Sequence, residues 1–338
     1  MKTEPALDRD ALRRQLLSAY GLSATAFTFV PTGWMSSCYN VICAGGVRVF
    51  VKLQPTNCAQ PVAASCPEFY LPLTRGLHDT GLLTTIAYPL PTSRGDLWVQ
   101  WGDWRIIVNN FIDGHVVGLN GVTDGVLGQL AAMVGRLHRS LPALDLPVAF
   151  RDRLEIPFEA ALRTALATLG EFAEGATPGQ LGLRDLLVPC KDELMGYLHL
   201  LETVRADVEA SGLPQPVICH TDLHGENLMV DGVGRLYILD WEGAILAPRE
   251  QDLFAFVGGS QFQDVFLPAY EAEGGPLVLH EDLLAFYGLR RHLEDLTDWI
   301  LLILAGRSGA EKDAADLLAT EDCLMGLRDR PWQAHPGT

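Results

Sequence analysis

The segment at residues 217–242 constrains the fold of this chain more than any other part of the sequence. It consists of a short apolar strand, a polar loop, and two further apolar runs separated by a turn at 231–234. The glycines of this turn predict a β-hairpin. The hairpin would return Asp240 to the loop that carries Asp222 and Asn227, so two carboxylates and one amide would meet. Oxygen ligands of this kind suit Mg²⁺.

The same segment allows other interpretations. Asp and Asn are common turn residues, so Asp222, Asn227 and Asp240 are also consistent with loop capping. His220 and His224 flank Asp222, and imidazole binds zinc, so a transition-metal site is a second alternative. The absence of further His or Cys nearby at zinc spacing disfavours it. Because His220 directly follows an apolar strand, we expect it to hold the loop by hydrogen bonds rather than to react.

The N-terminal third of the chain has the pattern of a small antiparallel sheet. Two pairs of β-rich runs are each separated by a glycine-containing turn, which predicts two hairpins. One helix is predicted between them over residues 67–77, where Pro72 makes it irregular. The predicted strands are residues 39–43, 47–53, 97–99 and 104–112.

The remainder of the chain is mainly helical, apart from the strand-rich stretch at 217–239. Its apolar residues recur at helical spacing, which predicts helices over residues 124–140, 158–172, 183–210, 281–304 and 311–327. We therefore predict an α+β protein of two lobes. The predicted parts are a small β-rich lobe with one main helix at 1–109, a hinge at 110–114, and a larger, mainly helical lobe at 115–338.

The loop at 220–227 resembles the catalytic loop of protein kinases, with Thr221 in place of the usual arginine. The form without arginine, followed by Asp-Trp-Glu at 240–242, resembles the aminoglycoside phosphotransferase and choline kinase family. The resemblance extends over residues 30–305 and implies a bilobal protein-kinase-like fold whose N-terminal lobe binds the nucleotide. Other matching features are Lys52 at a strand end, residues 109–114 at the hinge, and residues 248–253 after the metal-binding aspartate.

The resemblance implies transfer of the γ-phosphate of ATP, with Mg²⁺, to a hydroxyl of a small molecule. Phosphoryl transfer depends on positioning and charge neutralisation. Asp222 would orient the acceptor hydroxyl and take its proton. Asn227 and Asp240 would hold Mg²⁺, and Lys52 would bind the α- and β-phosphates.

The resemblance also implies supporting roles. Glu68 would pair with Lys52, although Ser65 and Glu68 also have the spacing of a helix capping box. Asp252 would hydrogen-bond the catalytic loop from beneath, or else cap the helix that follows it. The segment that would cover the phosphates carries one glycine, Gly33, so serine hydroxyls and backbone amides would make those contacts. The residues concerned are Ser36 and Ser37 over the phosphates, and Asn109, Asn110 and Phe111, whose backbone groups would bind adenine.

The acceptor would lie beside Asp222, and the helical run at 290–299 offers it a face. Carboxylates beside an indole suit a cationic amine, and Glu242 would add negative charge near the reaction centre. The candidates on this helix are Glu294, Asp295, Asp298 and Trp299. A solvated helix face with Trp299 in the core is the alternative.

The layout is most similar to the spectinomycin phosphotransferase branch of the family. We therefore predict an aminoglycoside or aminocyclitol antibiotic, such as spectinomycin, as the acceptor. The alternatives are a kinase of choline, homoserine, hydroxylysine or a sugar, and a non-catalytic nucleotide-binding pseudokinase.

Composition limits the partners. With 42 acidic and 25 basic residues, the formal net charge of −17 disfavours nucleic acid and anionic membranes and suits a cationic acceptor. Hydrophobic residues make up 48% of the 338, which predicts a folded core. Seven cysteines without a C-x-x-C pair predict reduced thiols, and the N-terminus has no signal-peptide pattern. We expect a cytoplasmic protein whose oligomeric state the sequence does not indicate.

Overall fold

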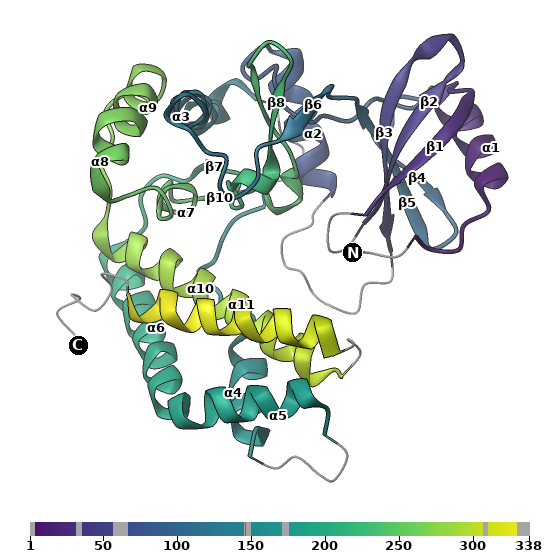
Figure 1. Ribbon diagram of the computed structural model, residues 1–338. Helices are drawn as coiled ribbons and strands as arrows, with labels where there is room; N and C mark the ends of the chain where they lie inside the picture. Colours follow the sequence, from purple (N-terminus) through teal and green to yellow (C-terminus); the bar gives the residue numbers. More distant parts are fainter. Residues whose placement is uncertain are drawn as a thin grey trace. The chain divides into compact units, whose positions relative to one another are not determined.

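The computed structural model describes residues 4–31, 36–56, 67–144, 146, 150–170, 176–306 and 310–329 (Figure 1). The chain divides into two compact units. The first unit combines residues 1–151, 217–247 and 258–277, and the second combines residues 152–216, 248–257 and 278–338. The segment at 217–242 therefore folds with the N-terminal part of the chain.

The first unit begins with a five-stranded antiparallel sheet in the order β1-β2-β3-β5-β4. Its strands are β1 (Ala24–Val30), β2 (Ser37–Cys43), β3 (Arg48–Pro55), β4 (Val99–Trp101) and β5 (Trp104–Asn110). Both predicted hairpins are confirmed, although β4 begins at Val99 rather than at Leu97. Val51 and Leu53 on β3 are buried in the sheet core, so Lys52 between them points to the opposite face.

Helix α1 (Arg9–Tyr20) packs against this sheet through Leu12 and Leu16 (Figure 1). It begins after Asp8, whose carboxylate accepts hydrogen bonds from two backbone N–H groups, and it ends at Gly21, which has a φ of 69°. Neither α1 nor β1 is among the predicted elements. Asp8 and Gly21 are nevertheless ordinary helix caps, and the sequence contained this signal.

The rest of the first unit surrounds the 217–242 segment. The strands β6 (Gly114–Val116), β8 (Leu228–Asp231) and β9 (Leu236–Ile238) form an antiparallel sheet, and β7 (Val217–Cys219) pairs with β10 (Ile245–Ala247). The predicted hairpin at 231–234 is confirmed. The helices are α2 (Pro67–Asp79), α3 (Asp124–Arg139), α8 (Gly259–Gln261), the π-helix η6 (Phe262–Phe266) and α9 (Leu267–Gly274). Short 3₁₀ turns are η1 (Ala44–Gly46), η2 (Leu141–Ala143), η4 (Gly225–Asn227) and η5 (Trp241–Gly243).

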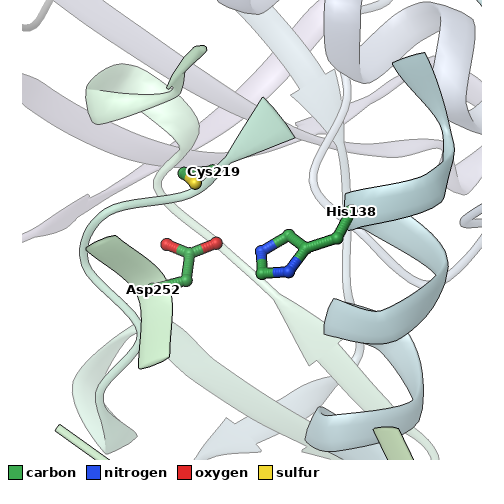
Figure 2. A group of neighbouring side chains, drawn as sticks. All are labelled: His138, Cys219 and Asp252. Atoms are coloured by element: carbon green, nitrogen blue, oxygen red, sulfur yellow. The ribbon is translucent and has the colours of Figure 1, made fainter. Parts of the chain in front are cut away.

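Helices α3 and α9 approach each other closely at Gly135. A Cβ atom added to Gly135 would lie 2.5 Å from the carbonyl oxygen of Tyr270, so only glycine fits there. One turn further along α3, Nδ1 of His138 lies 2.9 Å from the Tyr270 hydroxyl, and both side chains are buried. Figure 2 shows His138 on α3 and Cys219 at the end of β7, whose thiol donates to the Ala247 carbonyl at 3.7 Å. These polar groups stabilise the interior of the first unit.

The second unit is helical. Its elements are α4 (Glu159–Thr168), α5 (Pro178–Leu187), η3 (Val188–Cys190), α6 (Lys191–Ser211), α7 (Glu250–Leu253), α10 (Glu281–Leu304) and α11 (Ala310–Arg328). The prediction of one helix over 183–210 is wrong, because α5 and α6 are separate. Pro189 lies between them in η3, and proline lacks the N–H group that a continuous helix requires. Leucines such as Leu198, Leu201 and Leu293 form the core.

These elements confirm the predicted α+β class, while the lobe boundary at 110–114 stays a prediction. Among the described residues, no helix is both long enough and apolar enough to cross a membrane. No disulfide joins the cysteines that the structure describes, which are Cys38, Cys43, Cys190, Cys219 and Cys323.

Candidate active site

Asp222 lies in the loop between β7 and η4, and the side chain of Asn227 fixes its position. The Asn227 amide Nδ2 donates to the Asp222 carboxylate Oδ2 at 2.8 Å and to the Asp222 carbonyl at 2.9 Å. Asn227 is 9% exposed. Because the amide nitrogen is committed to Asp222, the amide oxygen of Asn227 is the atom that can bind a cation. The structure therefore brings these two predicted residues together.

His220 supports the loop from the buried side. Its Nδ1 accepts a hydrogen bond from the backbone N–H of Asp222 at 3.3 Å, so Nε2 carries the proton and donates to the Leu239 carbonyl at 2.7 Å. The fully buried ring meets Trp241 edge to face, with ring centroids 4.7 Å apart. Both ring nitrogens contact the backbone, which fits a supporting role and leaves neither as a zinc ligand.

His224 is a residue to which the resemblance assigned no role. Its Nδ1 accepts a hydrogen bond from Glu226 N at 3.3 Å, so Nε2 is the protonated nitrogen. That Nε2 lies 3.3 Å from Oδ2 of Asp222. The carboxylate of Asp222 is therefore oriented by two side chains of its own loop, Asn227 and His224. The close sequence spacing of these residues was the signal that could have revealed this.

Lys52 is enclosed by two carboxylates of the turn that follows β9. Its Nζ lies 2.8 Å from Oδ1 of Asp240 and 2.8 Å from Oε1 of Glu242. We call these three residues the lysine cluster. The side chains of Lys52 and Glu242 are 16% and 18% exposed, whereas that of Asp240 is 41% exposed. Asp240 is therefore the carboxylate of the cluster that is open to a cation from solution.

The charges of the lysine cluster stabilise one another. Burial would lower the pKa of Lys52, but Asp240 and Glu242 outweigh it and hold that pKa well above its usual range. The Lys52 ammonium in turn lowers the pKa of the Asp240 carboxyl, against the opposing effects of burial and of Asp222. At neutral pH Lys52 and Asp240 are therefore both charged.

The backbone next to Asp240 adopts an unusual conformation. Asp240 has a φ of 53°, and Thr221 in the opposite loop has a φ of 78°. The Thr221 hydroxyl donates a hydrogen bond to the Gly243 carbonyl at 3.0 Å. The loop that carries Asp222 and the turn that carries Asp240 are thus fastened directly to each other.

Ser36 and Ser37 are buried at the start of β2, at 3% and 4% exposure. The Ser36 hydroxyl donates to Oε1 of Glu242 at 3.5 Å, which links this segment to the lysine cluster. Gly33, in the predicted phosphate-covering segment, lies outside the described residues. Phosphate contact by Ser36 and Ser37 stays a prediction.

Glu68 is exposed in the first turn of α2. With Pro67, Pro72 and residues 95–98 it lines a cavity of about 410 Å³. Ser65, the other half of the alternative capping box, lies outside the described residues. Pairing of Glu68 with Lys52 stays a prediction, and the two carboxylates found on Lys52 were not foreseen as its partners.

The side chain and the backbone N–H of the predicted hinge residue Asn110 are hydrogen-bonded within the protein. Its side-chain oxygen accepts from Tyr88 N at 2.8 Å, and its amide donates to the Ile86 carbonyl at 3.2 Å. Its backbone N–H donates to the Tyr88 carbonyl at 3.1 Å. Asn110 therefore holds residues 86–88 against β5, and its N–H is not free for a ligand. Adenine recognition by the backbone of Asn109 and Phe111 stays a prediction.

Asp252 lies on α7 in the second unit (Figure 2). Its side chain is buried, at 3% exposure. Helix α7 begins at Glu250 and is preceded by Arg249, whose carbonyl accepts a hydrogen bond from Asp252 N at 3.1 Å. Asp252 is therefore inside a helix, and its interpretation as an N-cap is wrong. Its predicted support of the catalytic loop stays a prediction.

The predicted acceptor residues on the helical run lie on α10 of the second unit. Asp295 pairs with Arg291, with 2.9 Å between Oδ1 and Nε. Burial raises the pKa of Glu294, and burial together with Asp295 raises that of Asp298. Trp299 is half-buried rather than part of the fully buried core. An acidic face with an accessible indole is therefore present on α10, and its contact with an acceptor stays a prediction.

Comparison with known proteins gives one family. The family model described as the phosphotransferase enzyme family, APH, matches residues 28–288. A search of curated protein sequences finds no match.

Solved structures cover nearly the whole chain. Spectinomycin phosphotransferase in complex with ADP and spectinomycin has a TM-score of 0.75 and 19% identity, over 97% of this chain and 96% of that chain. Amicoumacin kinase in complex with AMP-PNP and Ca²⁺ has a TM-score of 0.61 and 16% identity, over 96% and 94%. Choline kinase from Streptococcus pneumoniae has a TM-score of 0.59 and 16% identity, over 95% and 99%. These similarities confirm the kinase-like fold that the sequence predicted.

Proposed function

Because this chain belongs to the phosphotransferase enzyme family, we propose that it transfers the γ-phosphoryl group of ATP to a hydroxyl group of a small cationic molecule. The observation that carries this proposal is the clustering of Asp222, Asn227 and the lysine cluster within the first unit. It supplies a carboxylate base, oxygen ligands for a cation, and a buried ammonium, which are the groups that phosphoryl transfer requires.

Asp222 is the proposed base. Its carboxylate is oriented by Asn227 and His224, so an acceptor hydroxyl hydrogen-bonded to it would be held with its oxygen directed toward the phosphorus. The carboxylate would take the hydroxyl proton as the new oxygen–phosphorus bond forms and the bond between the γ-phosphorus and the β,γ-bridging oxygen breaks, which releases ADP. Positioning of this kind contributes much of the rate in such reactions.

Asn227 and Asp240 fit a divalent cation. The Asn227 amide oxygen and the exposed Asp240 carboxylate are hard donors, and Mg²⁺ needs only one or two protein ligands besides phosphates and waters. Bound there, Mg²⁺ would neutralise charge on the phosphates. Lys52 would supply a further positive charge to the α- and β-phosphates.

For the acceptor we propose an aminoglycoside or aminocyclitol antibiotic such as spectinomycin. The net charge of −17 and the acidic face of α10 favour a cation. Similarity to spectinomycin phosphotransferase, at a TM-score of 0.75, supports the same choice. A second candidate is a metabolite alcohol that carries an amine, which the similarity to a choline kinase favours.

The test is an ATP-consumption assay with Mg²⁺ and a panel of acceptors. The panel comprises spectinomycin, aminoglycosides, choline, homoserine, hydroxylysine and neutral sugars, and the product is identified by mass spectrometry. We expect one phosphate added to an aminocyclitol or aminoglycoside, and no product with Asp222→Asn. Turnover of choline or another amino alcohol alone would favour the second candidate. Nucleotide binding without turnover of any acceptor would instead support a pseudokinase.

A further inference from the structure

The two carboxylates that contact Lys52 differ in exposure, and therefore in whether they can also bind a cation. Asp240 is 41% exposed and is the proposed ligand of the divalent cation, whereas Glu242 is 18% exposed. A cation at Asp240 would compete with the ammonium for the same carboxylate. Lys52 would then need a second partner, because an ammonium in a mostly buried position is costly without one. Glu242 already stands 2.8 Å from it.

Helix α2 offers a tyrosine to the lysine cluster. Tyr70 on α2 is 5% exposed, and its hydroxyl has no hydrogen-bond partner among the described residues. Burial raises the pKa of Tyr70, and the negative charge of Glu242 raises it further, so the phenol stays neutral beside the carboxylate. The side chain that α2 contributes beside the lysine cluster is therefore uncharged. By excluding water it strengthens the attraction between Lys52 and Glu242.

Glu242 is itself held in place. The oxygen that contacts Lys52 also accepts the hydrogen bond from Ser36 at 3.5 Å. The carboxylate belongs to η5, which the Thr221 hydroxyl fastens through Gly243. Glu242 is thus anchored on two sides, and an anchored carboxylate can hold a flexible lysine side chain in one position.

We propose that Glu242 is the positioning residue of Lys52, holding Nζ in place for the phosphates while Asp240 is engaged by a cation. This inference rests on the proposed function. It assigns Glu242 to Lys52, whereas the sequence predicts that Lys52 pairs with Glu68 and that Glu242 lies at the acceptor. An oxygen already shared by Lys52 and Ser36 is poorly placed to bind an amine of the substrate.

The experiment compares Glu242→Gln and Glu242→Asp with Glu68→Gln, which removes the partner predicted from the sequence, and with the control Glu155→Gln, at an exposed carboxylate of the second unit. Affinity for AMP-PNP with Mg²⁺ is measured by calorimetry, and KM and kcat are measured separately for ATP and for the acceptor. For Glu242→Gln we expect a loss of about tenfold or more in ATP affinity and in kcat/KM for ATP, with the acceptor KM within about twofold of wild type. Glu242→Asp should recover part of the loss, and Glu155→Gln should change neither constant by more than about twofold.

Three results would overturn the inference. One is a larger loss of nucleotide affinity in Glu68→Gln than in Glu242→Gln. Another is a rise in acceptor KM, without a change for ATP, in Glu242→Gln. The third is no effect of Glu242→Gln on either substrate. Thermal unfolding of each variant shows whether a loss reflects misfolding, and Glu242→Asp keeps the charge if Glu242→Gln does not fold.

Labelling of Lys52 separates this inference from the proposed function. Acetylation of Lys52 is measured by mass spectrometry relative to Lys191 and Lys312. Losing a carboxylate partner frees the amine, so we expect severalfold faster acetylation of Lys52 in Glu242→Gln and no change in Glu155→Gln. If the wild type bound no nucleotide, the proposed function would fail, and this labelling alone would decide whether Glu242 positions Lys52. Unchanged labelling in Glu242→Gln would contradict it.

Discussion

The hydroxyl of Thr221 donates a hydrogen bond to the carbonyl of Gly243 at 3.0 Å, from a left-handed backbone conformation with a φ of 78°. A β-branched residue seldom adopts this conformation, which costs roughly 1–3 kcal/mol. A Cβ atom on Gly243 would lie 2.5 Å from the Thr221 hydroxyl oxygen. The threonine and the glycine therefore fit each other closely, and they join the loop of the base to the turn of the lysine cluster.

This contact predicts a compensating pair of substitutions. Gly243→Ala should lower the free energy of unfolding by about 1–3 kcal/mol, because the new methyl group meets the Thr221 hydroxyl. Adding Thr221→Gly should restore much of that loss, since it removes both the hydroxyl and the backbone strain. Urea unfolding of the two single variants and the double variant measures the coupling. Losses that simply add would show that the two residues act independently.

The proposed base predicts a loss of turnover without a loss of nucleotide binding. Asp222→Asn should lower kcat by about 10²–10⁴-fold, because an amide cannot accept the hydroxyl proton. Affinity for AMP-PNP with Mg²⁺ should stay within about threefold of wild type. Glu226→Gln is the control, since it removes an exposed carboxylate of the same loop. Equal losses in both variants would argue for a general charge effect rather than a base.

The close approach of α3 and α9 predicts that two glycines of α3 differ in how well they tolerate replacement by alanine. Gly135→Ala should lower the free energy of unfolding by about 1–3 kcal/mol or more, because a Cβ there would lie 2.5 Å from the Tyr270 carbonyl. Gly128→Ala on the same helix meets its nearest atom at 3.7 Å, an ordinary contact. It should be neutral or stabilise by up to about 1 kcal/mol. Chemical denaturation compares them, and similar losses for both would contradict the packing described for Gly135.

The partly buried carboxyl of Glu294 predicts a pH-dependent cost. Its pKa lies above the ordinary value of 4.5, since burial disfavours the charged form. Between these two pKa values the folded chain binds more protons than the unfolded chain, so stability falls as pH rises through that window. Glu294→Gln should therefore raise the melting temperature at about pH 7.5 and lose that advantage near about pH 4.

The matched variant for Glu294→Gln is Asp295→Asn, whose carboxylate pairs with Arg291 at 2.9 Å. This variant removes a charge that is paired with Arg291, not a charge that burial disfavours. It should therefore give no gain in melting temperature. Melting curves across the pH range test both variants. A gain for Glu294→Gln that was equal at all pH values would mean that ionisation is not its cause.

Local patterns predicted much of the fold. The hairpins and most helices follow from alternation, helical spacing and glycine turns, and the hairpin at 231–234 brings Asp240 back to the loop of Asp222 as expected. The break between α5 and α6 was missed because the apolar spacing continues through it, although Pro189 marks it. Helix α1 lacks the wide apolar stripe of the predicted helices, since only Leu12 and Leu16 on it are buried.

The contacts of the site were harder to predict, because they join distant parts of the chain. Lys52 meets a carboxylate 188 residues away, and no spacing rule states which of several acidic residues will reach it. The hydrogen bonds between Asn110 and residues 86–88 likewise depend on how β5 packs against that segment. Sequence patterns predict which chemical groups form such a site, whereas the tertiary packing determines which of these groups pair.

The enclosure of Lys52 has a consequence for competition among anions. Two carboxylates already contact the ammonium, each at 2.8 Å. Free phosphate or sulfate approaching alone would meet repulsion rather than an unoccupied positive charge. A nucleotide that arrives with its own divalent cation brings the charge that Asp240 can accept. If the proposed function holds, inorganic anions are therefore expected to be weak inhibitors, and selectivity for metal-loaded nucleotide would begin before the phosphates reach the lysine.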